Sequence, residues 1–313
     1  MKRPHVVVYH PQESQIIGAI LAKKRPDIPL TVVSQIQDLE AIDLENVKIL
    51  LGWQVPMAFL QHWRSLRWIQ SFGAGVDTFI TLPSIQTGQV ILTRIIDLFN
   101  AHINQYVFAH ILYDLQCIEL TLRLNKQARW APFQPTSLQE KTLGLVGLGS
   151  IGQSIAQTAN IFNMPVIGWS RSQRSSASWL LMESLEMLLA RADFVVVALP
   201  LTPQTENLIT LKHLQQLKPE ACLINVGRGH TLNEADLLTA LDTGIIRKLV
   251  LDVFQQEPLP SEHPFWRHDK VIVTPHISGL GFQEEIVDFF LKNYDRFCAN
   301  QPLQGEVIPA QGY

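Results

Sequence analysis

Three glycines near the middle of the chain, Gly147, Gly149 and Gly152, are spaced as G-x-G-x-x-G. They follow residues 143–145, whose apolar run predicts a buried strand, and they precede residues 153–162, which predict a helix. The first glycine then permits a tight turn, the second lets the backbone approach a pyrophosphate, and the third lets the helix pack on the strand. Phosphates would lie at the helix N-terminus, where unpaired N–H groups favour anions. The pattern predicts a dinucleotide site, the alternative being a glycine-rich turn without a ligand.

The end of the next predicted strand, residues 165–169, bears on which dinucleotide binds. An NAD-specific site carries an Asp or Glu there, which binds the adenine ribose 2′-hydroxyl. Ser170 occupies this position here, and Arg171 and Arg174 follow it. No carboxylate repels a 2′-phosphate, and guanidinium groups can bind one bidentately. We therefore expect NADP as the cofactor, with NADPH preferred over NADH; the alternative is a solvated basic loop.

Arg228, Glu257 and His276 each follow a predicted strand in the second half of the chain. In an open parallel sheet, ligands bind outside the carboxyl ends of the strands, so all three would lie along the cofactor-facing edge. Arg can bind the oxygens of a 2-oxo acid bidentately, and His can protonate the carbonyl oxygen as hydride reaches the carbon. A Glu beside the imidazole holds the ring and favours its protonated form. The set predicts acid–base chemistry beside a nicotinamide, although each residue alone is compatible with an ordinary loop position.

Alternating strand and helix patterns position these residues in two units. The first unit has predicted strands at 6–9, 30–33, 49–51, 68–71 and 90–92, which indicate a parallel sheet. The second has six, at 143–145, 165–169, 194–198, 221–225, 249–252 and 271–273, with helices that include 182–192 and 233–243. A last helical pattern, 283–300, follows the completed second sheet, so we expect it to return to the first unit.

We therefore predict an α/β fold of two doubly wound parallel-sheet domains with the active-site cleft between them. The substrate domain is discontinuous and flavodoxin-like, over 1–99 and 282–313, and the Rossmann domain covers 100–281. Residues 100–124 predict one long helix within the latter, too apolar for a surface helix and therefore buried between domains or subunits.

Composition narrows the classes of protein. The 313 residues are 47% hydrophobic and 17% charged, which fits a globular protein with a large core. A net charge of −3 gives no reason to expect a nucleic acid or an anionic membrane as partner. The three cysteines are far apart and predict reduced thiols in a cytoplasmic protein, and we expect neither a signal peptide, a membrane span nor a bound metal.

Over essentially its whole length the chain resembles the D-isomer-specific 2-hydroxyacid dehydrogenases. The resemblance rests on G-L-G-S-I-G, L-P-L-T-P-Q-T, N-V-G-R-G, L-D-V-F-Q-Q-E-P-L-P and T-P-H-I-S, in the family's order. It implies that Arg228, Glu257 and His276 are catalytic. It also implies that the segment 72–77 holds the substrate carboxylate on the backbone N–H groups of Gly73, Ala74 and Gly75, in line with an anion nest.

A narrower resemblance is to the glyoxylate/hydroxypyruvate reductase A branch, in the segments V-Y-H-P, W-S-R-S and the closing G-Y. It implies NADPH-dependent reduction of a small 2-oxo acid and a homodimer formed through the 100–124 region. Gln105 and Gln311 depart from the Glu and Arg usual at those positions, which leaves the exact substrate open. Trp53 is similar to a substrate-facing aromatic of this branch, or is a core residue.

The residues expected to bind the cofactor are Gly147, Gly149, Ser150, Ile151, Gly152, Ser170, Arg171, Arg174, Leu199, Pro200, Thr205, Val226, Gly227 and Asp252. Two other functions are weighed against a 2-oxo acid reductase. A formate or phosphite dehydrogenase has the same fold, but the formate enzymes pair the His with Gln where this chain has Glu257. A cofactor-sensing binding protein would not need the complete Arg, Glu and His set.

Overall fold

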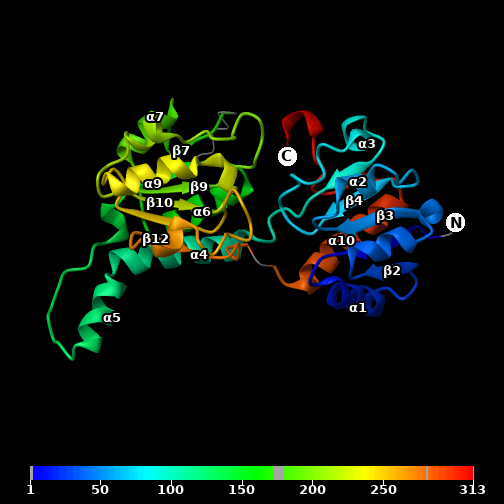
Figure 1. Cartoon of the computed structure of the whole chain (residues 1–313), viewed down its shortest axis with the longest axis horizontal. Coiled ribbons are helices and arrows are strands. Elements are labelled where there is room, and N and C mark those ends of the chain that lie inside the picture. The colour runs from blue at the N-terminus through cyan, green and yellow to red at the C-terminus, as the bar shows by residue number, and fades with distance from the viewer. Residues whose placement is uncertain (1–2, 172–179, 280, 313) are drawn as a thin grey trace. The chain divides into compact units, whose positions relative to one another are not determined.

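The computed structural model of the chain describes residues 3–171, 180–279 and 281–312, so Arg174 lies outside the described residues. The chain divides into two compact units, Met1–Leu98 with Gly281–Tyr313 and Phe99–Leu280. Each junction is one residue away from the boundary expected from the sequence. Figure 1 shows the order of the elements along the chain by colour. No helix in the described part has the length and hydropathy that a bilayer span needs.

The first unit is a parallel sheet with flavodoxin-like strand order, β2-β1-β3-β4-β5. Its strands are β1 (His5–Tyr9), β2 (Leu30–Val33), β3 (Val47–Gly52), β4 (Trp68–Ser71) and β5 (Ile91–Thr93). Its helices are α1 (Ser14–Lys24), α2 (Met57–Leu60), α3 (Pro83–Gln86) and α10 (Gln283–Cys298). The predicted return of the last helix is observed: Trp68 of β4 stacks on Phe290 and Phe297 of α10, with ring centroids 5.2 and 5.4 Å apart.

The second unit is a Rossmann sheet with order β12-β11-β10-β9-β6-β7-β8, parallel throughout. Its strands are β6 (Leu143–Val146), β7 (Val166–Trp169), β8 (Leu180–Leu181), β9 (Phe194–Val197), β10 (Cys222–Asn225), β11 (Lys248–Leu251) and β12 (Val271–Val273). Its helices are α4 (Asn100–Leu115), α5 (Ile118–Lys126), α6 (Ser150–Ile161), α7 (Leu185–Arg191), α8 (Leu211–Leu214) and α9 (Glu234–Asp242). The sequence predicted six strands, and the described residues form seven. The missed strand, β8, is only two residues long, too short for a periodic pattern.

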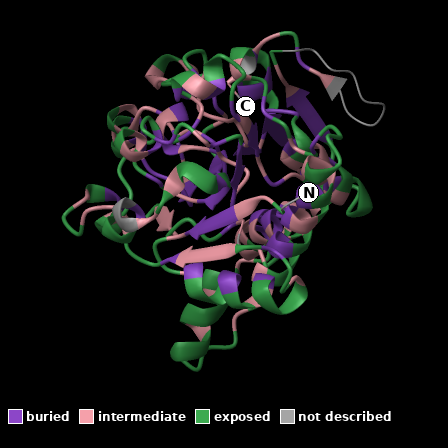
Figure 2. Cartoon of the chain, turned by 90° about the vertical axis from the view of Figure 1, so that its right-hand side faces the viewer, coloured by how far each residue is buried: buried purple, intermediate pink, exposed green. Residues whose placement is uncertain are grey.

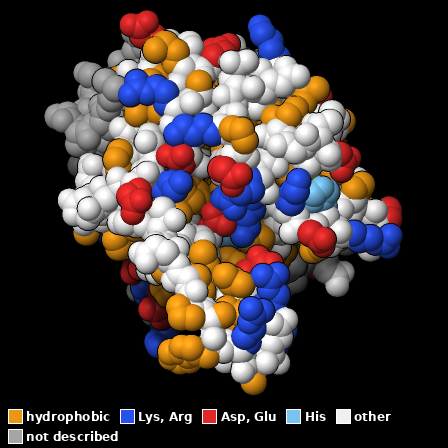
Figure 3. All heavy atoms as spheres, turned by 90° about the vertical axis from the view of Figure 1, so that its left-hand side faces the viewer, with side chains coloured by type: hydrophobic (Ala, Val, Ile, Leu, Met, Phe, Trp, Pro, Cys, Tyr) orange, Lys and Arg blue, Asp and Glu red, His pale blue; other side chains and the backbone are white. Residues whose placement is uncertain are grey.

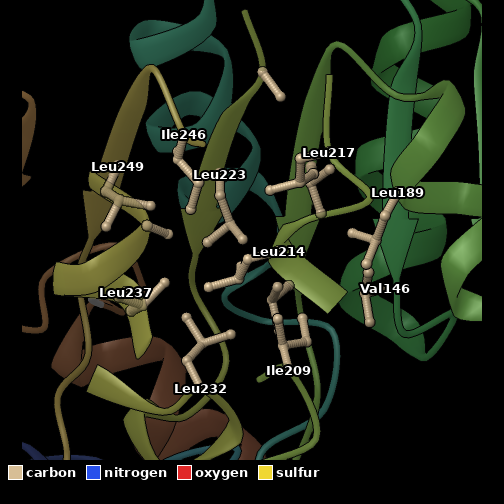
Figure 4. Close-up of a cluster of buried hydrophobic side chains, with 14 of the residues drawn as sticks. Val146, Leu189, Ile209, Leu214, Leu217, Leu223, Leu232, Leu237, Ile246 and Leu249 are labelled. Atoms are coloured by element: carbon tan, nitrogen blue, oxygen red, sulfur yellow. The ribbon is translucent and has the colours of Figure 1, made fainter. Parts of the chain in front are cut away.

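Apolar side chains on one face of the strands form the largest part of the cluster drawn in Figure 4, and the alternate strand residues on the other face are buried as well. Leu223 of β10 and Leu249 of β11 pack with Leu237 of α9 and Leu214 of α8 (Figure 4). Strands buried on both faces read as continuous apolar runs, which is why their positions were predictable. Figure 2 shows the same pattern, with strands largely buried and the outer surfaces of helices exposed.

The predicted single helix over 100–124 is wrong, because the segment forms two helices. α4 ends at Leu115, and Cys117 adopts a left-handed backbone conformation (φ 50°) before α5 begins. α4 buries one face against α6, where the side chain of Asn104 donates to Ser154 and Thr158. α5 has no buried residue, although the structure describes all of it. Figure 1 shows α5 projecting from the body of its unit.

Candidate active site

Two of the three glycines after β6 are required by close backbone contacts. Gly147 has φ 105°, a conformation that side chains rarely adopt, and a Cβ there would lie 2.8 Å from the Ala198 carbonyl oxygen. A Cβ on Gly152 would lie 2.0 Å from the Gly147 carbonyl oxygen. The turn and the close approach of α6 to the end of β6 therefore depend on these two residues, as the sequence pattern predicts.

Gly149 has the opposite environment. A Cβ there would meet no atom of the described residues within 4 Å, although Gly149 is the N-cap of α6. Its backbone is thus accessible at the positive end of a helix dipole, and this fits the phosphates of a dinucleotide. Next to it, Ser150 bonds the side chain of Asn100 on α4 with 3.0 Å between Nδ2 and Oγ, and Ile151 is half-buried.

The residues after β7 offer polar and basic groups for the adenine ribose of a dinucleotide. Ser170, directly after β7, is half-buried, and Arg171 is exposed. Neither is acidic, so the carboxylate that would select a 2′-hydroxyl is missing from these two described positions.

The loops after β9 and β10 contact each other beside the glycine turn. A Cβ on Gly227 would lie 2.6 Å from the Leu199 carbonyl oxygen. The hydroxyl of Thr205 donates to the Pro200 carbonyl oxygen at 2.6 Å and closes the turn between them. Val226 is buried. Thr205 and Val226 thus shape the loops through their packing and internal hydrogen bonds.

The loop that carries Arg228 packs on the loop that carries Glu257. A Cβ on Gly229 would lie 2.0 Å from the carbonyl carbon of Phe254, so only glycine permits this approach. The Phe254 N–H donates to Glu257 Oε1 at 3.0 Å, and Arg228 Nη1 donates to the Gly227 carbonyl oxygen at 2.8 Å. Arg228 and Glu257 therefore belong to one supported pair of loops.

His276 and Glu257 form a close pair, with 2.7 Å between Nδ1 and Oε2. Burial raises the pKa of Glu257, and the hydrogen bonds from His276 and the Phe254 N–H lower it. Together with the charges of His276 and Arg228 they bring this pKa below its usual range. The contact places a carboxylate oxygen against one ring nitrogen of His276 and so orients the imidazole.

Asp252, at the end of β11, positions the loop that carries His276. Its fully buried carboxylate accepts the N–H groups of Ile277 and Ser278, both at 2.9 Å, and the Thr274 hydroxyl at 2.6 Å. His276 itself has φ 53°, a strained conformation for a residue with a side chain. The sequence suggested that Asp252 binds the cofactor. A carboxylate without exposed surface and with three internal donors is instead a positioning group.

Sequence reasoning missed Tyr106 of α4, whose hydroxyl lies 2.7 Å from Thr274 Oγ1. Because the Thr274 hydroxyl proton goes to Asp252, Tyr106 is the donor in this contact. Burial raises the pKa of Tyr106, so it stays protonated and can donate. The two residues are 168 positions apart, and no local pattern indicates their contact.

In the first unit, Trp53 supports the loop at 72–77, called here the carboxylate loop because the sequence predicts that it binds the substrate carboxylate. The indole packs so closely on Gly73 that a Cβ there would lie 2.6 Å from Trp53 Cζ3. The Ser71 hydroxyl accepts the Gly73 N–H at 3.2 Å and donates to the Gly75 carbonyl oxygen at 3.0 Å. Ala74 and Gly75 are half-buried, as is Trp53 itself. The structure therefore gives Trp53 a packing role in this loop.

A family model described as "D-isomer specific 2-hydroxyacid dehydrogenase, NAD binding domain" matches residues 108–278. A glyoxylate/hydroxypyruvate reductase A from Salmonella newport is 32% identical to the chain, over 84% of this chain and 86% of that protein.

Two solved structures are similar over 99% of this chain and 100% of their own. One is a D-isomer specific 2-hydroxyacid dehydrogenase family protein from Aeromonas salmonicida, with 34% identity and a TM-score of 0.86. The other is an NADPH-dependent glyoxylate/hydroxypyruvate reductase from Sinorhizobium meliloti in complex with NADP and sulfate, with 29% identity and a TM-score of 0.89.

Proposed function

The chain belongs to the D-isomer specific 2-hydroxyacid dehydrogenase family, and on this premise we propose that it reduces small 2-oxo acids of the glyoxylate and hydroxypyruvate type to D-2-hydroxy acids with NADPH. The observation that carries the proposal is the 2.7 Å pair of His276 and Glu257, on loops next to the carboxyl ends of strands in a Rossmann sheet. The names of the relatives from Salmonella newport and Sinorhizobium meliloti support this substrate class.

The cofactor would be held by the residues after β6, β7, β9 and β10. The accessible backbone at Gly149 and the α6 N-terminus fit the pyrophosphate, while Ser170 and Arg171 suit a 2′-phosphate. The loops 199–205 and 225–229 would line the rest of the bound cofactor. When bound, NADPH supplies the hydride for the substrate carbonyl carbon.

The residues of the chain supply orientation and a proton. Arg228 binds the carbonyl and carboxylate oxygens of the substrate with its guanidinium fork. His276 donates a proton to the carbonyl oxygen, and Glu257 holds the ring by Nδ1, which leaves Nε2 as the donating atom. The loop Gly73, Ala74 and Gly75 binds the substrate carboxylate as an anion nest, in which the Gly73 N–H takes part only if it leaves its hydrogen bond to the Ser71 hydroxyl.

A turnover assay tests this function. NADPH oxidation is measured with glyoxylate, hydroxypyruvate, pyruvate and bulkier 2-oxo acids, and the first two should be reduced most efficiently. His276→Ala should lower kcat about 100-fold or more, as expected on removing a positioned general acid. Wild-type protein that reduces none of these acids, although it binds NADPH, would point to the cofactor-sensing alternative.

We further propose that the protein is a homodimer formed through α4, α5 and the loop that follows. Ile118 and Leu122 of α5 are 37% and 51% exposed, and Trp130 and Phe133 of the loop are 95% and 38% exposed. Figure 3 draws the side of the molecule that is on the left in Figure 1, and it shows hydrophobic side chains interspersed with basic ones on the lower, projecting part. Exposed apolar groups gathered on a projecting arm favour burial against a partner.

We also propose that the protein is cytoplasmic. Its three cysteines are free thiols, as expected of a protein in a reducing compartment.

A further inference from the structure

The carboxyl ends of β1, β3 and β4 in the first unit are aligned in register. Tyr9 pairs with Gly52, and Gly52 pairs with Ser71. The next residues of the three strands, His10, Trp53 and Phe72, therefore emerge side by side at one edge of the sheet. This edge includes the point between β1 and β3 where the strand order reverses, which is where ligands bind in such sheets.

His10 contacts the carboxylate loop directly. Its ring packs edge-on against Phe72, with 5.4 Å between the ring centroids, and Phe72 immediately precedes Gly73. The Trp53 ring lies on Gly73 from the neighbouring strand end. His10 is half-buried, so part of its ring remains accessible.

Hydrogen bonds set the tautomer of His10. Its Nδ1 accepts the N–H groups of Gln12 and Glu13 at 3.2 and 3.1 Å. Backbone N–H groups only donate, so Nδ1 carries no proton and the neutral ring must carry its proton on Nε2. Burial lowers the pKa of His10, and the nearby Glu13 opposes this only in part, so the neutral ring persists at neutral pH.

The Nε2–H is therefore a fixed, uncharged donor. It points away from the turn that Nδ1 caps, and no oxygen atom of the described residues accepts from it. An uncharged donor among aromatic rings suits a neutral oxygen better than a carboxylate, which the anion nest and a guanidinium bind more strongly.

We propose that His10 Nε2–H donates a hydrogen bond to a hydroxyl on carbon 3 of the substrate and makes His10 a specificity-determining residue for 3-hydroxy-2-oxo acids. The inference rests on the proposed function. A half-buried donor left unpaired by a substrate without this hydroxyl disfavours that substrate. One neutral hydrogen bond corresponds to about a 3- to 10-fold difference in kcat/KM.

Two variants separate the two nitrogen atoms of the ring. His10→Asn keeps an acceptor near the Nδ1 position and removes the Nε2 donor. His10→Gln keeps an amide N–H near the Nε2 position and removes the acceptor that caps the turn before α1. The readout is kcat/KM for hydroxypyruvate relative to pyruvate, which lacks the 3-hydroxyl, and relative to glyoxylate, which lacks carbon 3. The Tm of thermal unfolding shows whether the turn before α1 keeps the acceptor for the Gln12 and Glu13 N–H groups.

Wild-type protein should prefer hydroxypyruvate to pyruvate, and His10→Asn should lower both ratios about 3- to 10-fold. His10→Gln should keep the ratios within about twofold while lowering Tm, because only the cap is lost. Unchanged ratios in His10→Asn, an equal loss with all three acids, or a wild type that does not distinguish hydroxypyruvate from pyruvate would each overturn the inference. A wild type that reduces none of the acids overturns the proposed function itself.

Discussion

Replacing Glu257 by Gln removes the negative charge beside His276 with little change in side-chain size. Gln keeps a carbonyl oxygen for the Phe254 N–H, which Glu257 Oε1 now accepts at 3.0 Å, so the loop should keep its shape. The other position, 2.7 Å from His276 Nδ1 in the wild type, then carries an amide NH2 group, which cannot accept a hydrogen bond from a protonated Nδ1. The variant therefore tests the charge of the pair with the fold held constant.

The size of the effect follows from the geometry and exposure of the pair. A hydrogen bond to a charged group contributes about 1.5–3 kcal/mol. The side chains of His276 and Glu257 are 41% and 37% exposed, so solvent screening reduces the contribution to about 1 kcal/mol. At about 1.4 kcal/mol per pH unit, the midpoint of the pH–rate profile should move by about 0.7 of a pH unit.

The direction of the shift follows from the form of His276 that acts in reduction. The imidazolium is the proton donor, and the carboxylate favours it, so the loss of the carboxylate moves the midpoint to lower pH. The assay is kcat/KM for oxo-acid reduction across the pH range in wild type and Glu257→Gln. Glu262→Gln is the matched control, because it removes the same charge from an exposed position. A profile that Glu257→Gln leaves unmoved would refute the proposed coupling of His276 and Glu257.

Three further predictions concern the cofactor, the assembly and the loop that carries His276. Wild type should show higher kcat/KM with NADPH than with NADH, and Ser170→Asp with Arg171→Ala should move the preference toward NADH; a wild type that prefers NADH contradicts the assignment. Light scattering at micromolar concentration should detect a dimer, and a particle of 35.4 kDa would exclude one. Tyr106→Phe removes the donor to Thr274 and should lower the free energy of unfolding by about 1 kcal/mol in urea titrations; an unchanged value would show that this bond is not stabilising.

Local patterns in the sequence determined most of the secondary structure and the glycine turn. Strands such as Phe194–Val197 were predictable because apolar runs bounded by polar residues reflect burial on both faces. Gly147 and Gly152 were predictable because the turn and the close packing each need a residue without a Cβ. The contact of Gly152 with Gly147 is local, whereas the close approach of Gly147 to the Ala198 carbonyl oxygen joins distant parts of the chain.

Tertiary structure alone decided the features that depend on distant partners. The helical pattern over 100–124 continues through Cys117, but the chain turns there, and α5 leaves the body of its unit. Asp252 was expected among the cofactor-binding residues, yet its burial and its hydrogen bonds to the loop at 274–278 make it a positioning group. Neither outcome is encoded in a periodicity of 2 or 3.6 residues, because each depends on which surface covers the segment.

The candidate site shows the same division. The sequence by itself identified Arg228, Glu257 and His276, because parallel strands place their carboxyl ends at one edge of a sheet. It did not determine the 2.7 Å contact between His276 and Glu257, the hydrogen bond from Tyr106 to Thr274, or the double acceptance at His10 Nδ1. Residue type limits which groups can donate or accept, but only folding brings a donor within hydrogen-bond distance of its acceptor.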